Sequence, residues 1–230
     1  MKKTIFILIL ASLSLFAISC KKESAGKTQI TYYADIKLQG ANPYKMVKGT
    51  AWVDPGFTAT MNGVDVTDKI IVDDSDVNVN QFGMYKVTYT LTNADGYEFP
   101  FVRDVYVLGA GIANIYTVKT KYGSRNYSFP ILIEETATPD VYSIPDIFGY
   151  FYYLGRYPGY DAYGYDFACE GTIRVNPDNS VTIENCPDDW YFGGGFDLTS
   201  FDGSYDPATG VLSWTIEGDF SVTLIPESLD

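Results

Sequence analysis

Aromatic side chains crowd one short stretch of the sequence. Residues 148–167 read FGYFYYLGRYPGYDAYGYDF, and ten of these twenty residues are aromatic. Over residues 148–154 the pattern predicts a strand that carries aromatic rings on both faces. Beyond Gly155, glycine and proline interrupt the segment and favour a loop. Flat aromatic rings on a loop can stack on the apolar faces of sugar rings, while carboxylates and amides nearby bind hydroxyl groups.

The residue types that a carbohydrate site needs occur in or near this loop. The candidate ligand-binding residues are Tyr157, Tyr160, Tyr163, Asp161, Arg156 and Trp190. A structural interpretation competes with this one: the strand residues form a core and the loop tyrosines fasten the loop to its own domain. Asp161, Asp166 and Glu170 could also serve as glycosidase carboxylates, although no signature marks a pair.

Composition argues against several classes of function. The 230 residues include no histidine, which removes the usual general base and the commonest metal ligand. The formal net charge is −13 without a basic run that would neutralise phosphates, so we expect no nucleic-acid partner. The acids of Asp74-x-Asp76-x-Asn78 begin like a calcium loop but lack its glycine and distal glutamate. We therefore expect no enzyme activity, no cofactor and no metal.

The N-terminal segment has the features of an export signal. Residues 1–19 combine two lysines with a short apolar run, which is typical of a secretory signal peptide. The run is shorter than the roughly 20 residues of a spanning helix. The sequence Ala17-Ile18-Ser19-Cys20 resembles a bacterial lipobox, with alanine where leucine is commoner. The resemblance implies lipid attachment at Cys20 and an acylated tether over residues 20–30; the alternative is an uncleaved anchor.

Hydrophobic periodicity predicts an all-β chain. Alternating apolar residues and turn signals recur every 8 to 12 residues, and no 3.6-residue pattern follows the signal peptide. Val87, Tyr89 and Leu91 alternate with threonines, as in a strand with one buried face. Short links join the later strands in order, which predicts an antiparallel meander folded as a small barrel or as a second sandwich.

Motifs of the first half resemble the bacterial surface Ig-like modules related to hyalin-repeat and cadherin-like sandwiches. The motifs are DPG (54–56), DVT (65–67), GxYxVTYT (83–90), NADG (93–96) and RDVYV (103–107). The resemblance implies an N-terminal Ig-like β-sandwich over residues 31–108, in which the Tyr85 hydroxyl can bond back to nearby backbone. The boundary falls at Gly109-Ala110-Gly111, and residues 109–230 form the C-terminal β-rich domain.

Motifs of the second half resemble the C-terminal domain of Gram-negative surface lipoproteins associated with Sus-like glycan-uptake systems. They are SIPDIFGYFYYLGRYPGY (143–160), NPDNSVTIEN (176–185), WYFGGGF (190–196) and SYDPATGVLSWTI (204–216). The resemblance implies a protein anchored by lipid in the outer membrane, on its cell-surface or periplasmic face. The implied partners are a polysaccharide or an outer-membrane uptake complex. We expect a non-catalytic glycan-binding module; the alternative is a structural or adhesive envelope protein with a protein partner.

Two further cysteines flank a predicted hairpin. Pairing Ile173 with Ile183 in that hairpin puts its apolar side chains on one face. Cys186 then lies one residue out of register with Cys169, so a disulfide needs a bulge, for which Gly171 is a candidate. An exported protein meets oxidising conditions, so a disulfide and two small buried residues both remain open.

Overall fold

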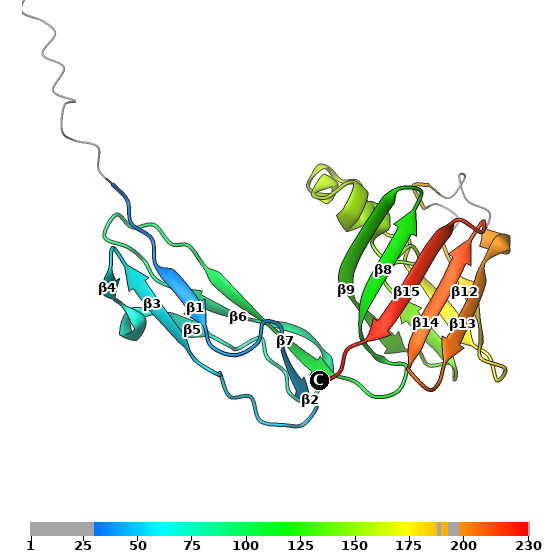
Figure 1. Ribbon diagram of the computed structural model, residues 1–230, viewed down its shortest axis with the longest axis horizontal. Coiled ribbons are helices and arrows are strands. Elements are labelled where there is room, and N and C mark those ends of the chain that lie inside the picture. Colours follow the sequence, from blue (N-terminus) through cyan, green and yellow to red (C-terminus); the bar gives the residue numbers. More distant parts are fainter. Residues whose placement is uncertain (1–29, 188–189, 193–197, 230) are drawn as a thin grey trace, which may run out of the picture.

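A computed structural model describes residues 30–187, 190–192 and 198–229 of the protein (Figure 1). The predicted signal peptide, Cys20 and the tether up to residue 29 lie outside the described residues, so these assignments stay predictions. The described chain consists of strands joined by turns and short helical segments, and the all-β prediction is confirmed.

The N-terminal half is a β-sandwich of two sheets. Its strands are β1 (Asp35–Leu38), β2 (Tyr44–Val47), β3 (Phe57–Met61), β4 (Val64–Asp65), β5 (Ile71–Asp73), β6 (Gly83–Thr90) and β7 (Phe101–Leu108). One sheet has the order β1-β3-β4 and the other β2-β7-β6-β5, with β2 parallel to β7. Val87 and Tyr89 are fully buried between the sheets, as their alternation predicted. The Ig-like resemblance therefore gave the correct fold for this half.

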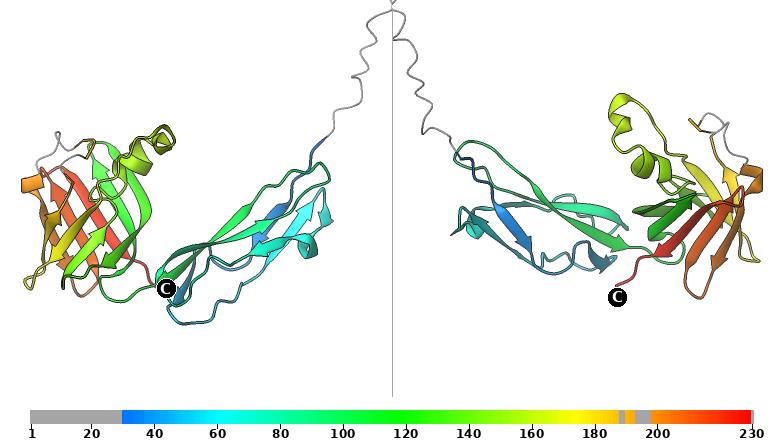
Figure 2. Two further views of the ribbon diagram at one scale, coloured as in Figure 1. Left: turned by 180° about the vertical axis from the view of Figure 1, so that it is seen from behind. Right: turned by 45° about the horizontal axis from the view of Figure 1, so that its top comes forward.

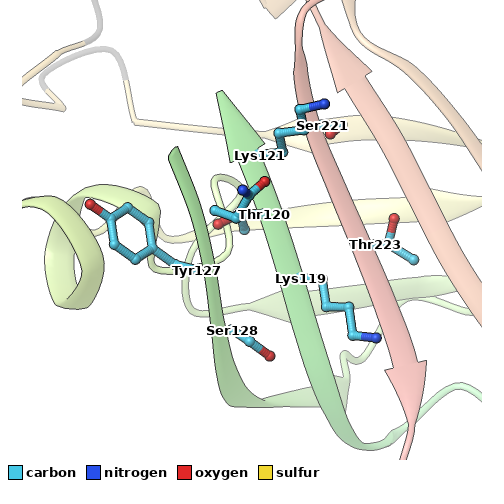
Figure 3. Close-up of a pocket in the computed structure, with 8 residues that line it drawn as sticks. Lys119, Thr120, Lys121, Tyr127, Ser128, Ser221 and Thr223 are labelled. Carbon is cyan, nitrogen blue, oxygen red and sulfur yellow. The ribbon is translucent and has the colours of Figure 1, made fainter. Parts of the chain in front are cut away.

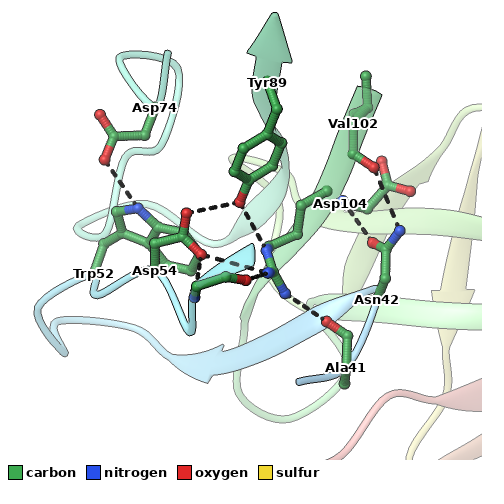
Figure 4. A network of polar contacts seen from close by, with 10 residues as sticks. Ala41, Asn42, Trp52, Asp54, Asp74, Tyr89, Val102 and Asp104 are labelled. Carbon is green, nitrogen blue, oxygen red and sulfur yellow. Dashed lines mark hydrogen bonds and ion pairs between the residues drawn. The ribbon is translucent and has the colours of Figure 1, made fainter. Parts of the chain in front are cut away.

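A buried arginine cross-links the sandwich (Figure 4). The Arg103 Nε donates to the Tyr89 hydroxyl at 3.0 Å. Its terminal nitrogens donate to the carbonyl oxygens of Ala41 at 3.0 Å and Gly56 at 2.9 Å. Asp54 lies 3.4 Å from the guanidinium and accepts a 2.8 Å hydrogen bond from the Tyr89 hydroxyl. Because the buried charge has an opposite charge and several acceptors, the desolvation of the guanidinium is compensated.

Two local expectations for the sandwich can be compared with its contacts. The Tyr85 hydroxyl donates to the carbonyl oxygen of Gln81 at 2.9 Å, so the predicted tie to nearby backbone is confirmed. In the acidic loop, Asp74 accepts a 3.0 Å hydrogen bond from the indole of Trp52. Asp76 accepts one of 3.2 Å from the backbone of Lys86. These acids therefore fasten their loop to the sandwich.

The C-terminal half is a closed barrel of eight antiparallel strands. They are β8 (Asn114–Tyr122), β9 (Arg125–Glu135), β10 (Val141–Ile144), β11 (Gly171–Val175), β12 (Ser180–Asn185), β13 (Asp202–Asp206), β14 (Val211–Ile216) and β15 (Phe220–Pro226). The strands are paired in chain order and β15 closes on β8, so the barrel is the form that the predicted meander adopts. Eight strands enclose a space that side chains can fill, and buried aliphatic and aromatic residues occupy it.

The two halves meet near the C-terminus (Figure 1), where polar contacts and a small apolar cluster join them. Lys45 of β2 forms a 2.6 Å ion pair with Glu227, whose carboxylate also accepts a hydrogen bond from the Thr117 hydroxyl. The backbone N–H of Gly109 donates to the Asn114 side chain at 2.8 Å. The apolar residues at the joint are Tyr106, Leu108, Ile115 and Leu132. Burial, aided by nearby carboxylates, raises the pKa of Tyr106 to about 12.

Candidate functional site

The aromatic segment between β10 and β11 projects as an arm from the barrel end opposite the joint (Figure 2). The prediction of a strand over residues 148–154 is wrong. The chain instead forms a π-helical turn, η3 (Phe151–Arg156), followed by the 3-10 turn η4 (Tyr160–Tyr163). Gly149 and Tyr150 have φ angles of 58° and 62°, which reverse the chain where a strand would continue. A Cβ on Gly149 would lie 2.6 Å from the Val118 side chain, so only glycine fits this close approach.

A buried carboxyl group holds the base of the arm. Asp146 is fully buried, and its oxygens accept backbone hydrogen bonds from Phe148 at 2.8 Å and Tyr150 at 2.9 Å. A third bond of 3.3 Å comes from the backbone N–H of Cys169, where the chain returns to the barrel. Burial raises the pKa of Asp146 to about 7, although the three backbone donors act in the opposite direction. Asp146 thus joins the outgoing and returning ends of the arm.

The inner aromatic residues of this region form the core at the barrel end. Phe148 is stacked on Trp190 with ring centroids 4.4 Å apart, and the Trp190 indole donates to the carbonyl oxygen of Phe167 at 3.0 Å. Trp190 is only 8% exposed, so its ring packs inside the barrel instead of forming an open platform. The structural interpretation therefore describes Phe148 and Phe151 well, and Trp190, a ligand-binding candidate from the sequence, lies in the same core.

Outer aromatic rings continue this cluster to the surface. We call five outer residues the aromatic patch: the half-buried Tyr157 and the exposed Tyr160, Tyr163, Tyr165 and Tyr191. Tyr163 is 80% exposed, Tyr191 60% and Tyr160 46%. Ring centroids are 5.6 Å apart between Tyr157 and Tyr160, and 6.3 Å between Tyr160 and Tyr163. Tyr165 connects Tyr160 to Tyr191 at 6.2 and 6.0 Å, so the exposed rings form one continuous surface.

Polar groups border the aromatic patch. The guanidinium of Arg156 lies 5.1 Å from the ring centre of Tyr157, within the range of a cation–π contact. Burial, and then the negative charges of Asp161 and Asp166, raise the pKa of Tyr153. The Asp161 carboxylate of η4 is therefore near enough to Tyr153 of η3 to disfavour ionisation of its hydroxyl.

A pocket of about 240 Å³ adjoins the aromatic patch. It is lined by Asp166, Ala168, Glu170, Pro187, Trp190 and Tyr191. Asp166 uses one oxygen to accept a 2.9 Å hydrogen bond from the backbone of Ala168, and Glu170 is exposed. Two carboxylates beside exposed rings are suited to accept hydrogen bonds from the hydroxyl groups of a sugar.

The structure thus brings together most of the predicted site. Tyr157, Tyr160 and Tyr163 lie in the aromatic patch, and Arg156 and Asp161 border it. Trp190 lies beneath and reaches only the wall of the pocket. Sequence reasoning missed Tyr165 and Tyr191 as surface rings. Tyr165 follows two residues after Tyr163, whereas Tyr191 is 26 residues further along and reaches the patch only through the fold.

The two cysteines lie next to this pocket. Ile173 pairs with Ile183 as predicted, and the register shifts beyond this pair so that Thr172 faces Asn185. The extra residue is therefore Glu184, on the strand opposite the one expected to bulge. The sulfur atoms of Cys169 and Cys186 lie 2.6 Å apart. Contact with the second sulfur, and then burial, raises the pKa of Cys169, and the disulfide itself stays a prediction.

Gly171 has a packing role in place of the predicted bulge. A Cβ at this position would lie 2.6 Å from the carbonyl oxygen of Asn185 and 3.1 Å from the Ile147 side chain. The glycine therefore lets β11 and β12 approach closely beneath the arm.

An Ig-like sandwich followed by a closed antiparallel barrel defines the class of protein, and comparisons with known proteins identify its family. Residues 36–107 match the family described as bacterial surface protein, Ig-like domain. Residues 106–226, more than half of the chain, match the C-terminal domain of BT2262-like proteins. The chain belongs to this family of bacterial surface lipoproteins, which confirms the predicted resemblance.

A solved structure supports the same assignment. The crystal structure of the lipoprotein BT2262 from Bacteroides thetaiotaomicron is 30% identical in sequence to this chain, with a TM-score of 0.55. The match covers 85% of this chain and 100% of that chain. A comparison with curated proteins gave no match. The matching descriptions are those of surface proteins and name no enzyme activity. Among the described residues, no helix is long and apolar enough to cross a membrane.

Proposed function

We propose that this lipoprotein is attached to the outer membrane through acylated Cys20 and binds glycans without catalysing a reaction. The proposed site consists of the aromatic patch and the neighbouring pocket with Asp166 and Glu170. In this proposal the chain acts as an accessory module that brings polysaccharide to an outer-membrane uptake complex. The lipobox resemblance and membership of a surface lipoprotein family support the membrane attachment.

The exposure of the aromatic patch is the main observation that supports the proposal. Monomeric proteins rarely leave adjacent large rings open to water, so such a group marks a surface that contacts another molecule. Tyrosine suits a polyhydroxylated ligand because its flat ring stacks on apolar C–H groups while its hydroxyl stays in water.

Mutual packing also prepares the aromatic patch for binding. Tyr165 is stacked on Phe167 at 5.8 Å, and Phe167 contacts Tyr191 at 4.9 Å. Phe167 is buried, so the exposed rings rest on a fixed support. Side chains that are already ordered lose little conformational entropy when a ligand binds.

Retention on polysaccharide gels would test the glycan-binding site. Mature protein that starts after Cys20 would be run through native gels that contain different neutral and acidic polysaccharides. We expect slower migration in at least one gel, and loss of the retardation in the Tyr160→Ala/Tyr163→Ala variant. Tyr97→Ala is the matched control because Tyr97 is also exposed but belongs to the sandwich. Equal migration in every gel, or equal retardation of both variants, would contradict the proposal.

A separate experiment addresses the anchor. Cells that produce the full chain would be given a palmitate analogue, and the Cys20→Ser variant would be compared with the native protein. We expect label and outer-membrane fractionation for the native protein, and loss of both in the variant. An unlabelled native protein that retains its initiator methionine would refute the lipid anchor.

A further inference from the structure

One side of the barrel is free of acidic residues although the chain contains 29 of them. The strands β14, β15 and β8, and residues 125–133 of β9, contain no aspartate or glutamate. These four neighbouring strands carry three cations, Lys119, Lys121 and Arg125. The acids next to these segments in sequence lie at their ends: Glu134 in β9, Glu227 after β15, and Glu217 and Asp219 in the turn between β14 and β15. This face is therefore locally positive on a protein of net charge −13.

Strand register arranges polar side chains around the two lysines. Lys119 pairs with Thr223 of β15 on one side and Ser128 of β9 on the other. Lys121 pairs in the same way with Ser221 and Asn126. The result is two parallel rows of three polar residues, each with a lysine at its centre. Residues two apart along a strand are separated by about 7 Å, so both rows fit beneath one ligand.

These residues line an open pocket of about 390 Å³ on the outer surface of the barrel (Figure 3). Both lysine side chains extend toward β15, while Tyr127 at the edge points toward the arm. Between the lysines, Thr120 is buried and its methyl group faces Gly149 inside the barrel. Within the described part of the chain, neither lysine forms an ion pair or a side-chain hydrogen bond. Both ammonium groups are thus available to an external anion.

The lining chemistry defines the class of ligand. A lysine ammonium binds a carboxylate or sulfate as a compact charge with three donors. The hydroxyls of Ser128, Ser221 and Thr223 and the amide of Asn126 both donate and accept hydrogen bonds. A ligand that satisfies all of these groups carries negative charges together with hydroxyl groups. Acidic saccharides combine both.

We infer that the outer face of β15, β8 and β9 binds the carboxylate or sulfate groups of an acidic saccharide through Lys119 and Lys121. This site is separate from the aromatic patch, so it does not depend on the glycan-binding function proposed for that patch. Ionic attraction at an exposed face is screened by salt, so binding weakens as ionic strength rises.

The test compares charged polymers with neutral counterparts that have the same sugar backbone. Polygalacturonate is compared with its full methyl ester, and dextran sulfate with dextran, by titration of the mature protein. We expect the native protein to bind at least one charged polymer more tightly than its neutral counterpart. The Lys119→Gln/Lys121→Gln variant should bind that polymer about tenfold more weakly, since two exposed ion pairs are lost. The two charged polymers distinguish carboxylate from sulfate recognition.

A control variant shows whether weaker binding comes from loss of this site or from the change in net charge. Lys48→Gln/Lys69→Gln removes the same two charges from exposed positions of the sandwich and should bind as the native protein does. Equal losses in both variants, or no charge preference at all, would overturn the inference. Loss only in Tyr160→Ala/Tyr163→Ala would overturn it as well, while supporting the aromatic patch. Lysine-dependent binding to phosphatidylglycerol vesicles but not to polymers would replace the saccharide with a lipid headgroup.

Discussion

Replacing Asp146 with asparagine should remove a pH dependence from the stability of the barrel. The native carboxyl group is fully buried beneath the arm, and burial raises its pKa to about 7. Its value in an unfolded chain is about 4. Between these two values the unfolded chain is ionised at Asp146 while the folded chain keeps the proton. The unfolded state therefore binds fewer protons, and stability falls as pH rises through this window.

The size of the effect follows from the difference between the two pKa values. About three pKa units at 1.36 kcal/mol each give an upper limit of about 4 kcal/mol between roughly pH 4 and pH 7. Asparagine cannot ionise, so the stability of Asp146→Asn has no pH-dependent contribution from this side chain. Its amide nitrogen cannot accept a hydrogen bond, so one of the three backbone N–H groups loses its acceptor. That loss costs about 1–3 kcal/mol at every pH.

Urea denaturation at a series of pH values would measure the difference. The fluorescence of Trp190 and Trp214 reports on the barrel because both indoles are buried there. The advantage of the native protein over Asp146→Asn should shrink as pH rises from about 4 to about 7. Parallel curves for the two proteins would refute the reasoning. A carboxyl pKa below 4, measured by carbon NMR, would show that the backbone donors of Phe148, Tyr150 and Cys169 outweigh burial.

Three further changes test other parts of the structure. Arg103→Met should destabilise the sandwich by about 3–5 kcal/mol, because Asp54 and two carbonyl oxygens lose their contacts with the guanidinium. Calorimetry would measure this loss as a lower melting temperature. If Cys169 and Cys186 form a disulfide in the exported protein, it closes a loop of 17 residues and contributes about 3 kcal/mol to stability. Reductant should then lower the melting temperature of the native protein but not that of Cys186→Ser. Gly149→Ala should destabilise the barrel by more than about 1 kcal/mol, whereas Gly159→Ala, which meets open space, should cost less.

Alternation and turn chemistry made the strands predictable. Val87 and Tyr89 face the core because every second residue of a strand points to the same side. The register of Ile173 with Ile183 followed from placing apolar residues on one face. The bulge could not be placed in the same way, because the extra Glu184 is exposed and changes no buried pair.

The arm escaped prediction because aromatic residues suit both a strand and a packed turn. The decisive groups are Gly149, which fits against Val118, and Asp146, which binds three backbone N–H groups. Neither contact produces a periodic pattern of residues in the sequence. The lysine site likewise depends on a contact between distant parts of the chain: Lys119 and Lys121 meet Thr223 and Ser221 only when β15 closes the barrel on β8.

Hydroxyl-radical footprinting of the protein with and without a retained polysaccharide would test most directly whether the aromatic patch is the glycan-binding surface. We expect protection of Tyr160, Tyr163 and Tyr191, with Tyr97 unchanged. Protection that is absent from these tyrosines, or confined to the sandwich, would contradict it.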